Sequence, residues 1–177
     1  FNLNFFFFYN FNILNTKIKI IVNVYDLKLA KQKIQDYCAY QERCHQEVSS
    51  KLKSWGLIPD AIDMLLGELM QHNFLNEERF ATLFAGGHFR IKQWGKGKIQ
   101  YALQQKRVSP VNIKKALKCI DLDDYNTTLL FLAKKKWNSL KGERGLSRMA
   151  KTQAFLYQRG FESALIQPIL QQLNKGK

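Results

Sequence analysis

Apolar residues recur along this chain in three copies of one helical template. The first copy is Val48, Leu52, Leu57, Ile62, Leu65, Leu66 and Leu69. The second lies 51 positions later, at Ile99, Leu103, Val108, Ile113, Ala116, Leu117 and Ile120. The third lies 53 positions further on, at Thr152, Leu156, Phe161, Ile166, Ile169, Leu170 and Leu173, so that 20 of the 21 positions are apolar. Repetition at this period indicates one supersecondary unit used three times.

Another amphipathic helix precedes each copy, and turn residues interrupt the template at its middle. The preceding apolar faces are Leu27, Ala30, Ile34, Tyr37 and Cys38, then Phe80, Ala81, Phe84, His88 and Ile91, then Leu122, Tyr125, Leu129, Leu132, Ala133 and Trp137. Gly56 and Gly160 suit the left-handed residue that ends a helix, and Ser109-Pro110 suits an N-cap followed by a first helical position. The pattern predicts an all-α fold of three tandem three-helix repeats, at residues 26–75, 76–120 and 121–174, that pack into an elongated, curved helical body.

Smaller signals refine the helix boundaries. Asn76, followed by two acids, and Asp121, followed by Asp123 and Asp124, are typical of helix starts. The segments 95–97 and 141–145 are glycine-containing and predict loops between the first and second helices of the second and third repeats. Gly86-Gly87 falls inside a predicted helix, and we interpret it as a close helix crossing or a kink.

The first 24 residues differ from the rest, because 19 of them are Phe, Asn, Ile, Lys or Tyr. No basic segment precedes the Phe run and no small-residue cleavage site follows it, so the segment does not match a secretory signal. Its asparagines also interrupt any stretch that would span a bilayer. We interpret residues 1–25 as a disordered or adventitious tail outside the fold, with a peripheral membrane anchor as the alternative.

The net charge of +14 is concentrated in two windows. Residues 88–120 contain nine Lys or Arg residues and no acid, and residues 131–160 contain eight against the single acid Glu143. The remainder of the chain is slightly acidic. This asymmetry favours a polyanionic partner, either nucleic acid or an acidic protein surface, over an anionic membrane.

Catalytic and metal-binding constellations are not recognisable in the sequence. Cys38, Cys44 and Cys119 lack CxxC spacing and favour a reducing cytosol, and His45, His72 and His88 do not pair with other ligands at metal-binding spacing. The stretch Gly95 to Ile99 lacks the Gly-Lys-Ser/Thr ending and the preceding strand of a phosphate loop. We therefore expect a cytoplasmic, monomeric protein that is not an enzyme and needs no cofactor or metal.

The basic windows supply the candidate binding residues. A charged helix surface usually serves only solvation, but an ordinary solvated face mixes signs, which these windows do not. Trp94 and Tyr101 lie beside the lysines and are candidates for stacking on bases, whereas Trp137 is assigned to the core. The candidate contact residues are Arg90, Lys92, Lys96, Lys98, Lys106, Arg107, Lys134, Lys135, Lys136, Arg144 and Arg148. Binding through them would depend on salt and little on sequence.

Local strings of the chain resemble the RecX family, regulators of the RecA recombinase. The strongest match is Phe74-Leu75-Asn76-Glu77-Glu78-Arg79-Phe80-Ala81, which continues with Gly95-Lys96-Gly97-Lys98-Ile99, Leu103, Lys106 and Val108. The third repeat adds Lys135-Lys136-Trp137 and residues 155–161, and the first repeat fits at Ala39, Arg43, Val48, Leu52 and Gly56. Cys44, Gly86-Gly87 and the tail before Tyr25 depart from the family pattern. The resemblance covers residues 26–174.

The resemblance implies a non-enzymatic protein that lies along the groove of the RecA filament on single-stranded DNA. There it would modulate ATP hydrolysis and strand exchange, in the inhibitory direction, during recombination, DNA repair and the SOS response. The basic residues named above would contact the filament and, through it, DNA. Two alternatives stay open: a non-specific nucleic-acid-binding helical module that acts without RecA, and a helical scaffold for another acidic protein.

Overall fold

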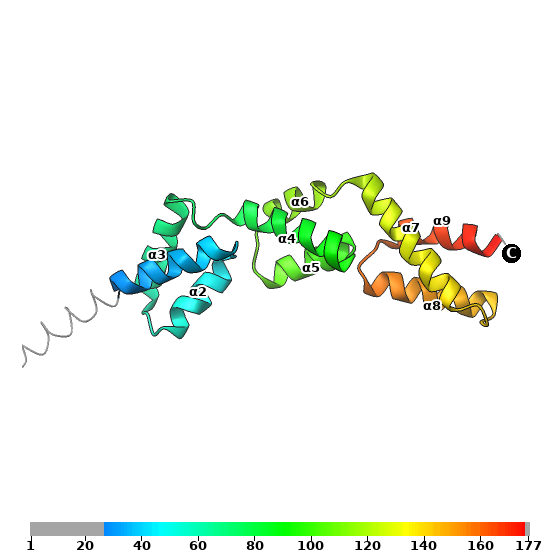
Figure 1. Ribbon diagram of the computed structural model, residues 1–177, viewed down its shortest axis with the longest axis horizontal. Helices are drawn as coiled ribbons and strands as arrows, with labels where there is room; N and C mark the ends of the chain where they lie inside the picture. The colour runs from blue at the N-terminus through cyan, green and yellow to red at the C-terminus, as the bar shows by residue number, and fades with distance from the viewer. Residues whose placement is uncertain (1–26, 176–177) are drawn as a thin grey trace, which may run out of the picture. The chain divides into compact units, whose positions relative to one another are not determined.

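Every regular element that the structure describes is an α-helix (Figure 1). The computed structural model describes residues 27–175, so the interpretation of residues 1–25 lies outside the described residues. The chain divides into two compact units, one ending at Leu75 and the other beginning at Asn76. The predicted all-α repeat fold is confirmed, and the helices follow one another in groups of three.

The first unit packs three helices around one apolar core. They are a helix over residues 27–40, α2 (His45–Ser54) and α3 (Pro59–Gln71). The core side chains are at most 4% exposed and come from all three helices and the segment after α3: Ile34, Cys38, Val48, Leu52, Ile62, Leu65, Leu69 and Leu75. Gly56 ends the turn after α2 with a φ of +82°, as its position predicted.

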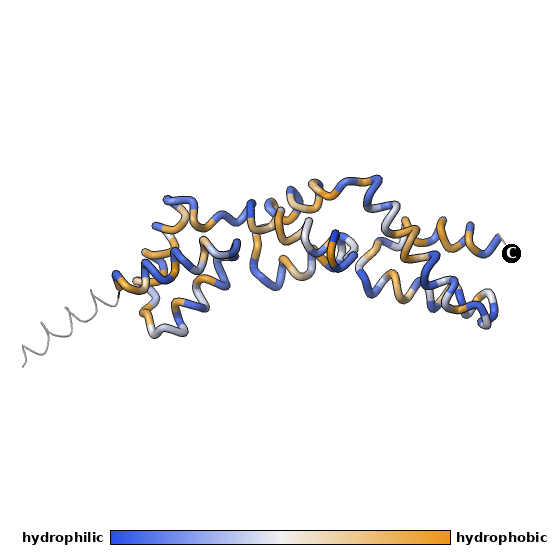
Figure 2. The backbone as a smooth tube through the Cα atoms, viewed as in Figure 1, coloured by the Kyte–Doolittle hydropathy of each residue, from blue (hydrophilic) through white to orange (hydrophobic). Residues whose placement is uncertain are grey.

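Six helices make up the part of the second unit that the structure describes. Their bounds are α4 (Glu77–Lys92), α5 (Lys96–Gln105), α6 (Pro110–Lys118), α7 (Leu122–Ser139), α8 (Gly145–Gln158) and α9 (Ser163–Lys175). The helices α4, α5 and α6 pack on one another, as do α7, α8 and α9. In Figure 2 hydrophobic and hydrophilic positions alternate along these helices, as expected when each buries one face.

The repeated template lies in the core of each group of three helices. Sixteen of its 21 positions are buried and the other five are half-buried. Its single polar position, Thr152, is completely buried, and its hydroxyl donates a hydrogen bond to the carbonyl oxygen of Arg148 at 2.8 Å. That bond satisfies the hydroxyl within the helix, so a threonine fits where the other copies carry valine and isoleucine.

Helix starts follow the predicted caps, and two apolar positions do not follow the predicted burial. The side chain of Asn76 accepts from the amide of Arg79, and that of Asp121 accepts from the amides of Asp123 and Asp124. Ile91 and Leu122 were expected on buried faces but are 83% and 64% exposed. Ile91 is exposed because α4 buries a different face from the predicted one. Its buried face continues through Ala85 and Phe89 and does not include Phe84, His88 and Ile91. Leu122 is the first residue of α7, ahead of its first buried turn.

A close backbone approach in the second unit lies at Gly95 and Gly160. Of the two interpretations of Gly86-Gly87, the close helix crossing is not found there. A Cβ placed on Gly87 would meet nothing within 4 Å, and one on Gly86 would meet only the side chain of Arg90. A Cβ on Gly95, in contrast, would overlap the backbone of Gly160 and Phe161. The two glycines therefore bring the start of α5 against the end of α8.

Hydrogen bonds across this approach cap α5. The amides of Gly95 and Gly97 donate to the carbonyl oxygens of Arg159 and Gly160, at 2.7 and 3.0 Å. The amide of Lys96 donates to the hydroxyl of Tyr125 at 2.9 Å. These donors would otherwise lack partners at a helix N-terminus, so the third group of helices supplies the cap that α5 does not have in its own sequence. The interpretation of the segment 95–97 as a loop is thus corrected, because Lys96 already begins α5.

Candidate nucleic-acid interface

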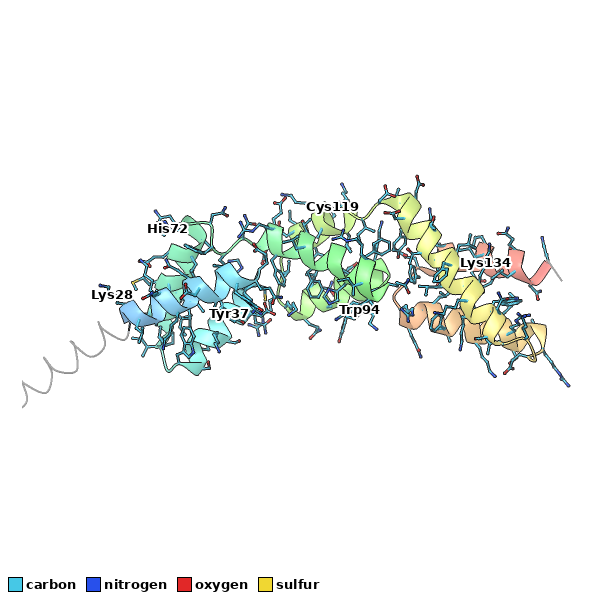
Figure 3. The ribbon with its side chains drawn as sticks, in the orientation of Figure 1. Lys28, Tyr37, His72, Trp94, Cys119 and Lys134 are labelled. Atoms are coloured by element: carbon cyan, nitrogen blue, oxygen red, sulfur yellow. The ribbon has the colours of Figure 1, made fainter. Side chains whose placement is uncertain are left out.

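Aromatic rings gather on the surface where α4 ends and α5 begins. Phe84 and His88 are four residues apart on one face of α4, and their rings stack with centroids 3.8 Å apart. Trp94, labelled in Figure 3, follows the helix end, and its ring lies 4.6 Å from that of His88. The left-handed residue Gln93, with a φ of +53°, turns the chain so that Trp94 comes back beside α4. All three rings are half-buried, so each presents part of its surface to solvent.

Three lysines surround these rings. The Nζ atoms of Lys92 and Lys98 lie 5.1 and 4.8 Å from the centroid of the Trp94 ring. The Nζ of Lys106 lies 5.7 Å from the centroid of the Phe84 ring. Each such contact contributes about 0.5–1 kcal/mol at an exposed site. We call Phe84, His88, Lys92, Trp94, Lys98 and Lys106 the cation–aromatic cluster.

His88 is held in its neutral form within the cluster. Burial is the main cause that lowers its pKa below 6.5, and the charges of Lys92 and Lys106 lower it further, against the hydrogen bond to the backbone of Phe84. Nδ1 lies 2.9 Å from the carbonyl oxygen of Phe84, and Nε2 lies 3.3 Å from the Nζ of Lys92. The carbonyl can only accept and the ammonium can only donate, so the proton of the neutral ring is on Nδ1. His88 thus orients Lys92 beside Trp94.

The cluster continues onto α8 through one arginine. The Nη1 atom of Arg159 donates to the carbonyl oxygen of Lys92 at 3.1 Å, and its Cζ lies 4.9 Å from the centroid of the Phe155 ring. The Nζ of Lys136 lies 5.6 Å from the same ring. Lys98 also reaches the end of α8, where its Nζ is 3.5 Å from the carbonyl oxygen of Gln158. One basic and aromatic surface therefore extends over both groups of helices in the second unit.

The other predicted contact residues lie outside the cluster. Arg90 is exposed on α4 with its guanidinium over Gly86, and Arg107 is exposed after α5 with a φ of +57°. Lys96 is half-buried, and its Nζ lies 4.9 Å from the centroid of the Tyr125 ring. Three further residues are exposed: Lys134 and Lys135 on α7, where Figure 3 labels Lys134, and Arg144 at the start of α8.

Arg148 has to be removed from the candidate surface. It is only 5% exposed, its Nε donates to the carbonyl oxygen of Trp137 at 2.7 Å, and its Cζ lies 4.3 Å from the centroid of the Trp137 ring. The guanidinium thus ties α8 to the end of α7. Its expected role in binding is corrected to a structural one, because a buried guanidinium cannot meet a partner.

Four residues of this surface were not selected from the sequence: Phe84, His88, Phe155 and Arg159. Phe84 and His88 are on the helix face that the apolar pattern predicts to be buried, and Phe155 and Arg159 are not among the predicted contact residues. A signal for them does exist, because Phe84, His88 and Lys92 are spaced by four, as are Phe155 and Arg159. Aromatic and basic residues at this spacing share one helix face, which the counting of charges alone does not reveal.

The arrangement is suited to single-stranded nucleic acid. Half-exposed rings offer stacking surfaces for bases, and the surrounding cations can bind phosphates. No acid occurs between His88 and Lys118 in the sequence to repel a polyanion. Within residues 27–175, no three His, Cys, Asp or Glu residues are grouped so that they could hold a metal ion.

Membrane insertion through the described helices is not indicated. In the part of the chain that the structure describes, none of the helices has the length and apolar character needed to cross a bilayer.

Comparison with known proteins identifies the same architecture in one family. The family model for the second three-helix domain of RecX matches residues 76–117, and the model for the third three-helix domain of RecX matches residues 123–170. A regulatory protein RecX from Chlorobium phaeobacteroides is 35% identical over 135 residues, which cover 75% of this chain and 85% of that protein. The crystal structure of RecX from Lactobacillus salivarius superposes with a TM-score of 0.78 at 22% identity, over 85% of this chain and 98% of that one.

Some relatives are longer than this chain. A regulatory protein RecX from Clostridium perfringens is 30% identical over 137 residues, which cover 76% of this chain but 64% of that protein. In another strain of the same species the matched region covers 46% of the relative.

Proposed function

The chain belongs to the RecX family of regulatory proteins, and from this we propose that it binds the RecA recombinase filament on DNA. In this proposal it modulates the filament in the inhibitory direction, reducing ATP hydrolysis and strand exchange in recombination, DNA repair and the SOS response. It acts as a cytoplasmic monomer, without a catalytic step of its own. The cation–aromatic cluster is the observation that supports this proposal most directly.

The cluster favours a partner that presents both phosphates and unstacked bases. A recombinase filament assembled on single-stranded DNA offers both, next to protein. Lys92, Lys98 and Lys106 would neutralise phosphates, and Trp94 would cover a base. Arg159 links the cluster to α8, so the contact would extend along more than one group of helices.

DNA-dependent ATP hydrolysis by the cognate RecA, measured with increasing amounts of this chain, tests the proposal. Single-stranded DNA should be present in large excess over both proteins. Inhibition that persists under excess DNA supports binding to the filament. Loss of inhibition under excess DNA would instead support the second candidate, a non-specific nucleic-acid-binding module, which the half-exposed rings and the cations around them also favour.

Charge reversal tests whether the cluster itself, and not the net charge of the chain, is needed for inhibition. We expect Lys92→Glu/Lys98→Glu/Lys106→Glu to raise the concentration for half-inhibition by at least about tenfold, because each lost phosphate contact costs on the order of 1 kcal/mol. The matched control is Lys28→Glu/Lys33→Glu/Lys53→Glu, with the same change in net charge on exposed lysines of the first unit. Equal inhibition by both variants would show that the cluster makes no contact with the filament.

A further inference from the structure

A groove between α5 and α6 shares no residue with the cation–aromatic cluster. It has a volume of about 410 Å³. Lys96, Gln100 and Gln104 line it from α5 and are spaced four residues apart, so they form one row along the helix. At 1.5 Å per residue this row is about 12 Å long, which is the length of two helical turns.

Helix α6 supplies an apolar floor and a basic rim. Ile113 is buried and Leu117 is half-buried, and both line the groove. Lys114 and Lys118 lie one turn apart on the same helix, line the same groove and are exposed. The neighbouring Lys115 points elsewhere, because it forms an ion pair with Glu78 at the start of α4 at 2.6 Å. None of the described residues that line the groove is acidic or aromatic.

We propose that this groove binds an acidic amphipathic helical segment of a partner protein. An apolar side chain of the segment covers Leu117 and the edge of Ile113, while carboxylates spaced by one turn pair with Lys114 and Lys118. The amides of Gln100 and Gln104 provide hydrogen-bond donors and acceptors on the opposite rim. The proposal does not depend on the binding of RecA or of DNA by the cluster.

The lining favours a peptide over nucleic acid. Bases need flat rings to stack on, and no described ring lines the groove. Phosphates placed over Ile113 and Leu117 would lose hydration without gaining a partner at the floor. An amphipathic acidic helix matches both parts of the surface, because it carries apolar and carboxylate side chains at the spacing that the groove offers.

Fluorescence anisotropy of the full chain with a labelled synthetic peptide tests the proposal. The probe is a helix-forming peptide of about fourteen residues, with leucines spaced three and four apart and glutamates flanking them. We expect Lys114→Glu/Lys118→Glu to weaken binding by at least about tenfold, because two ion pairs become repulsive contacts. The matched control, Lys28→Glu/Lys33→Glu, changes the net charge equally on exposed residues of the first unit and should change the affinity less than about twofold.

The apolar floor is tested separately from the charges. Leu117→Ala should weaken binding of the same peptide about fivefold, from the loss of buried apolar surface. A peptide of identical composition but scrambled order should bind the wild-type chain at least about fivefold more weakly than the ordered probe. Circular dichroism of each variant confirms that the helices are retained.

Three results would overturn the proposal. Equal binding of the scrambled and ordered peptides would reduce the interaction to charge attraction. Equal losses in the Lys114/Lys118 and Lys28/Lys33 variants would place the contact outside the groove. Displacement of the peptide by an oligothymidylate whose own binding depends on Lys114 and Lys118 would make the groove a nucleic-acid site.

Discussion

At the scale of single residues, the hydroxyl of Tyr125 on α7 connects the start of α5 with the segment before α9. The side chain is 1% exposed, accepts a hydrogen bond from the amide of Lys96 and donates one to Oε2 of Glu162 at 2.6 Å. Burial, and next the bond to Glu162, raise its pKa, so it remains a protonated donor. Its ring also lies between Phe89 and Phe161, with centroids 5.7 and 5.2 Å away.

Removing this hydroxyl should destabilise the chain. We expect Tyr125→Phe to lower the free energy of unfolding by about 1–3 kcal/mol, because the amide of Lys96 would be left in a partly buried site without its partner. Urea denaturation followed by circular dichroism measures the change. The control is Tyr101→Phe at a residue that is 62% exposed, and it should stay within about 0.5 kcal/mol of wild type. Equal effects of the two substitutions would refute the bridging role of Tyr125.

His88 should make the folded chain less stable as the pH falls below neutrality. Its pKa is lowered in the folded state by burial first, so the unfolded chain binds a proton more readily than the folded chain does. The contribution of His88 is therefore fully present above the ordinary pKa of 6.5 and is lost as the pH falls below it.

The comparison with His88→Gln isolates this effect. Between about pH 7.5 and pH 5.5 the urea midpoint of the wild type should fall more than that of the variant, because glutamine does not titrate. An NMR titration of the His88 ring should give a midpoint below 6.5. Parallel midpoints for the two proteins across this range, or a ring that titrates at or above 6.5, would contradict the assignment.

The distribution of charge along the chain does not distinguish a buried arginine, Arg148, from one on the basic surface, Arg159. Both lie in the same basic window, yet the first is buried against Trp137 and the second joins the cluster. The difference arises from contacts between segments that are 11 residues apart in one case and 67 in the other. A pattern along the chain does not contain that information.

At the scale of helices, the capping of α5 by the end of α8 depends on two glycines. Gly95 leaves room for the backbone of Gly160, and Gly160 has a φ of +88°, which residues with a Cβ rarely adopt. The position of Gly160 at a helix end was predicted from the sequence and is confirmed. Its contact with α5 was not, because the partner lies 65 positions earlier in the chain and no local signal marks it.

A pair of glycine-to-alanine substitutions should have opposite effects on stability. Gly95→Ala forces its Cβ against the backbone of Gly160, which cannot yield as a flexible side chain would, and should cost about 1–3 kcal/mol or more. Gly87→Ala lies within α4, meets nothing within 4 Å and should gain about 0.5–1 kcal/mol from helix propensity. Thermal unfolding of both variants checks the signs. A neutral Gly95→Ala would show that the two segments can move apart at little cost.

The phase of α4 shows why the candidate site was only partly predictable. The apolar pattern suggested one face through Phe84, His88 and Ile91, whereas the buried face runs through Ala85 and Phe89. Both faces contain large apolar or aromatic residues, so hydrophobicity alone does not choose between them. The half-buried face carries the Phe84 and His88 rings of the cluster, so the wrongly predicted face coincides with the candidate binding surface.

At the scale of the whole molecule, the repeats agree in their buried positions and differ in their charge. Residues 27–75 contain six basic and six acidic side chains, while residues 76–177 contain twenty basic and seven acidic ones. The buried template maintains the three-helix architecture in both units and places no constraint on surface charge. The difference in charge between the two units can be predicted from the sequence, because it depends on residue types alone and not on contacts.

The uneven charge predicts how the binding of single-stranded DNA should respond to salt. Replacing Lys92, Lys98 and Lys106 with glutamine removes three cations from the cluster and should reduce the slope of log K against log salt by about 2, since each phosphate contact contributes about 0.7. The same replacement at Lys28, Lys33 and Lys53 in the balanced unit should leave the slope unchanged. Fluorescence anisotropy with labelled oligothymidylate at several salt concentrations measures both slopes.

Trp94→Ala completes this test, because stacking and charge differ in their response to salt. Loss of the ring should weaken binding by about 1–3 kcal/mol while the slope stays at its wild-type value, since no cation is removed. A variant that lowers affinity and slope together would mean that Trp94 acts by holding Lys92 and Lys98 in place, 5.1 and 4.8 Å from its ring. Equal slopes for the cluster and control variants would mean that DNA responds to net charge alone, so that the position of the basic surface in the second unit carries no specific role.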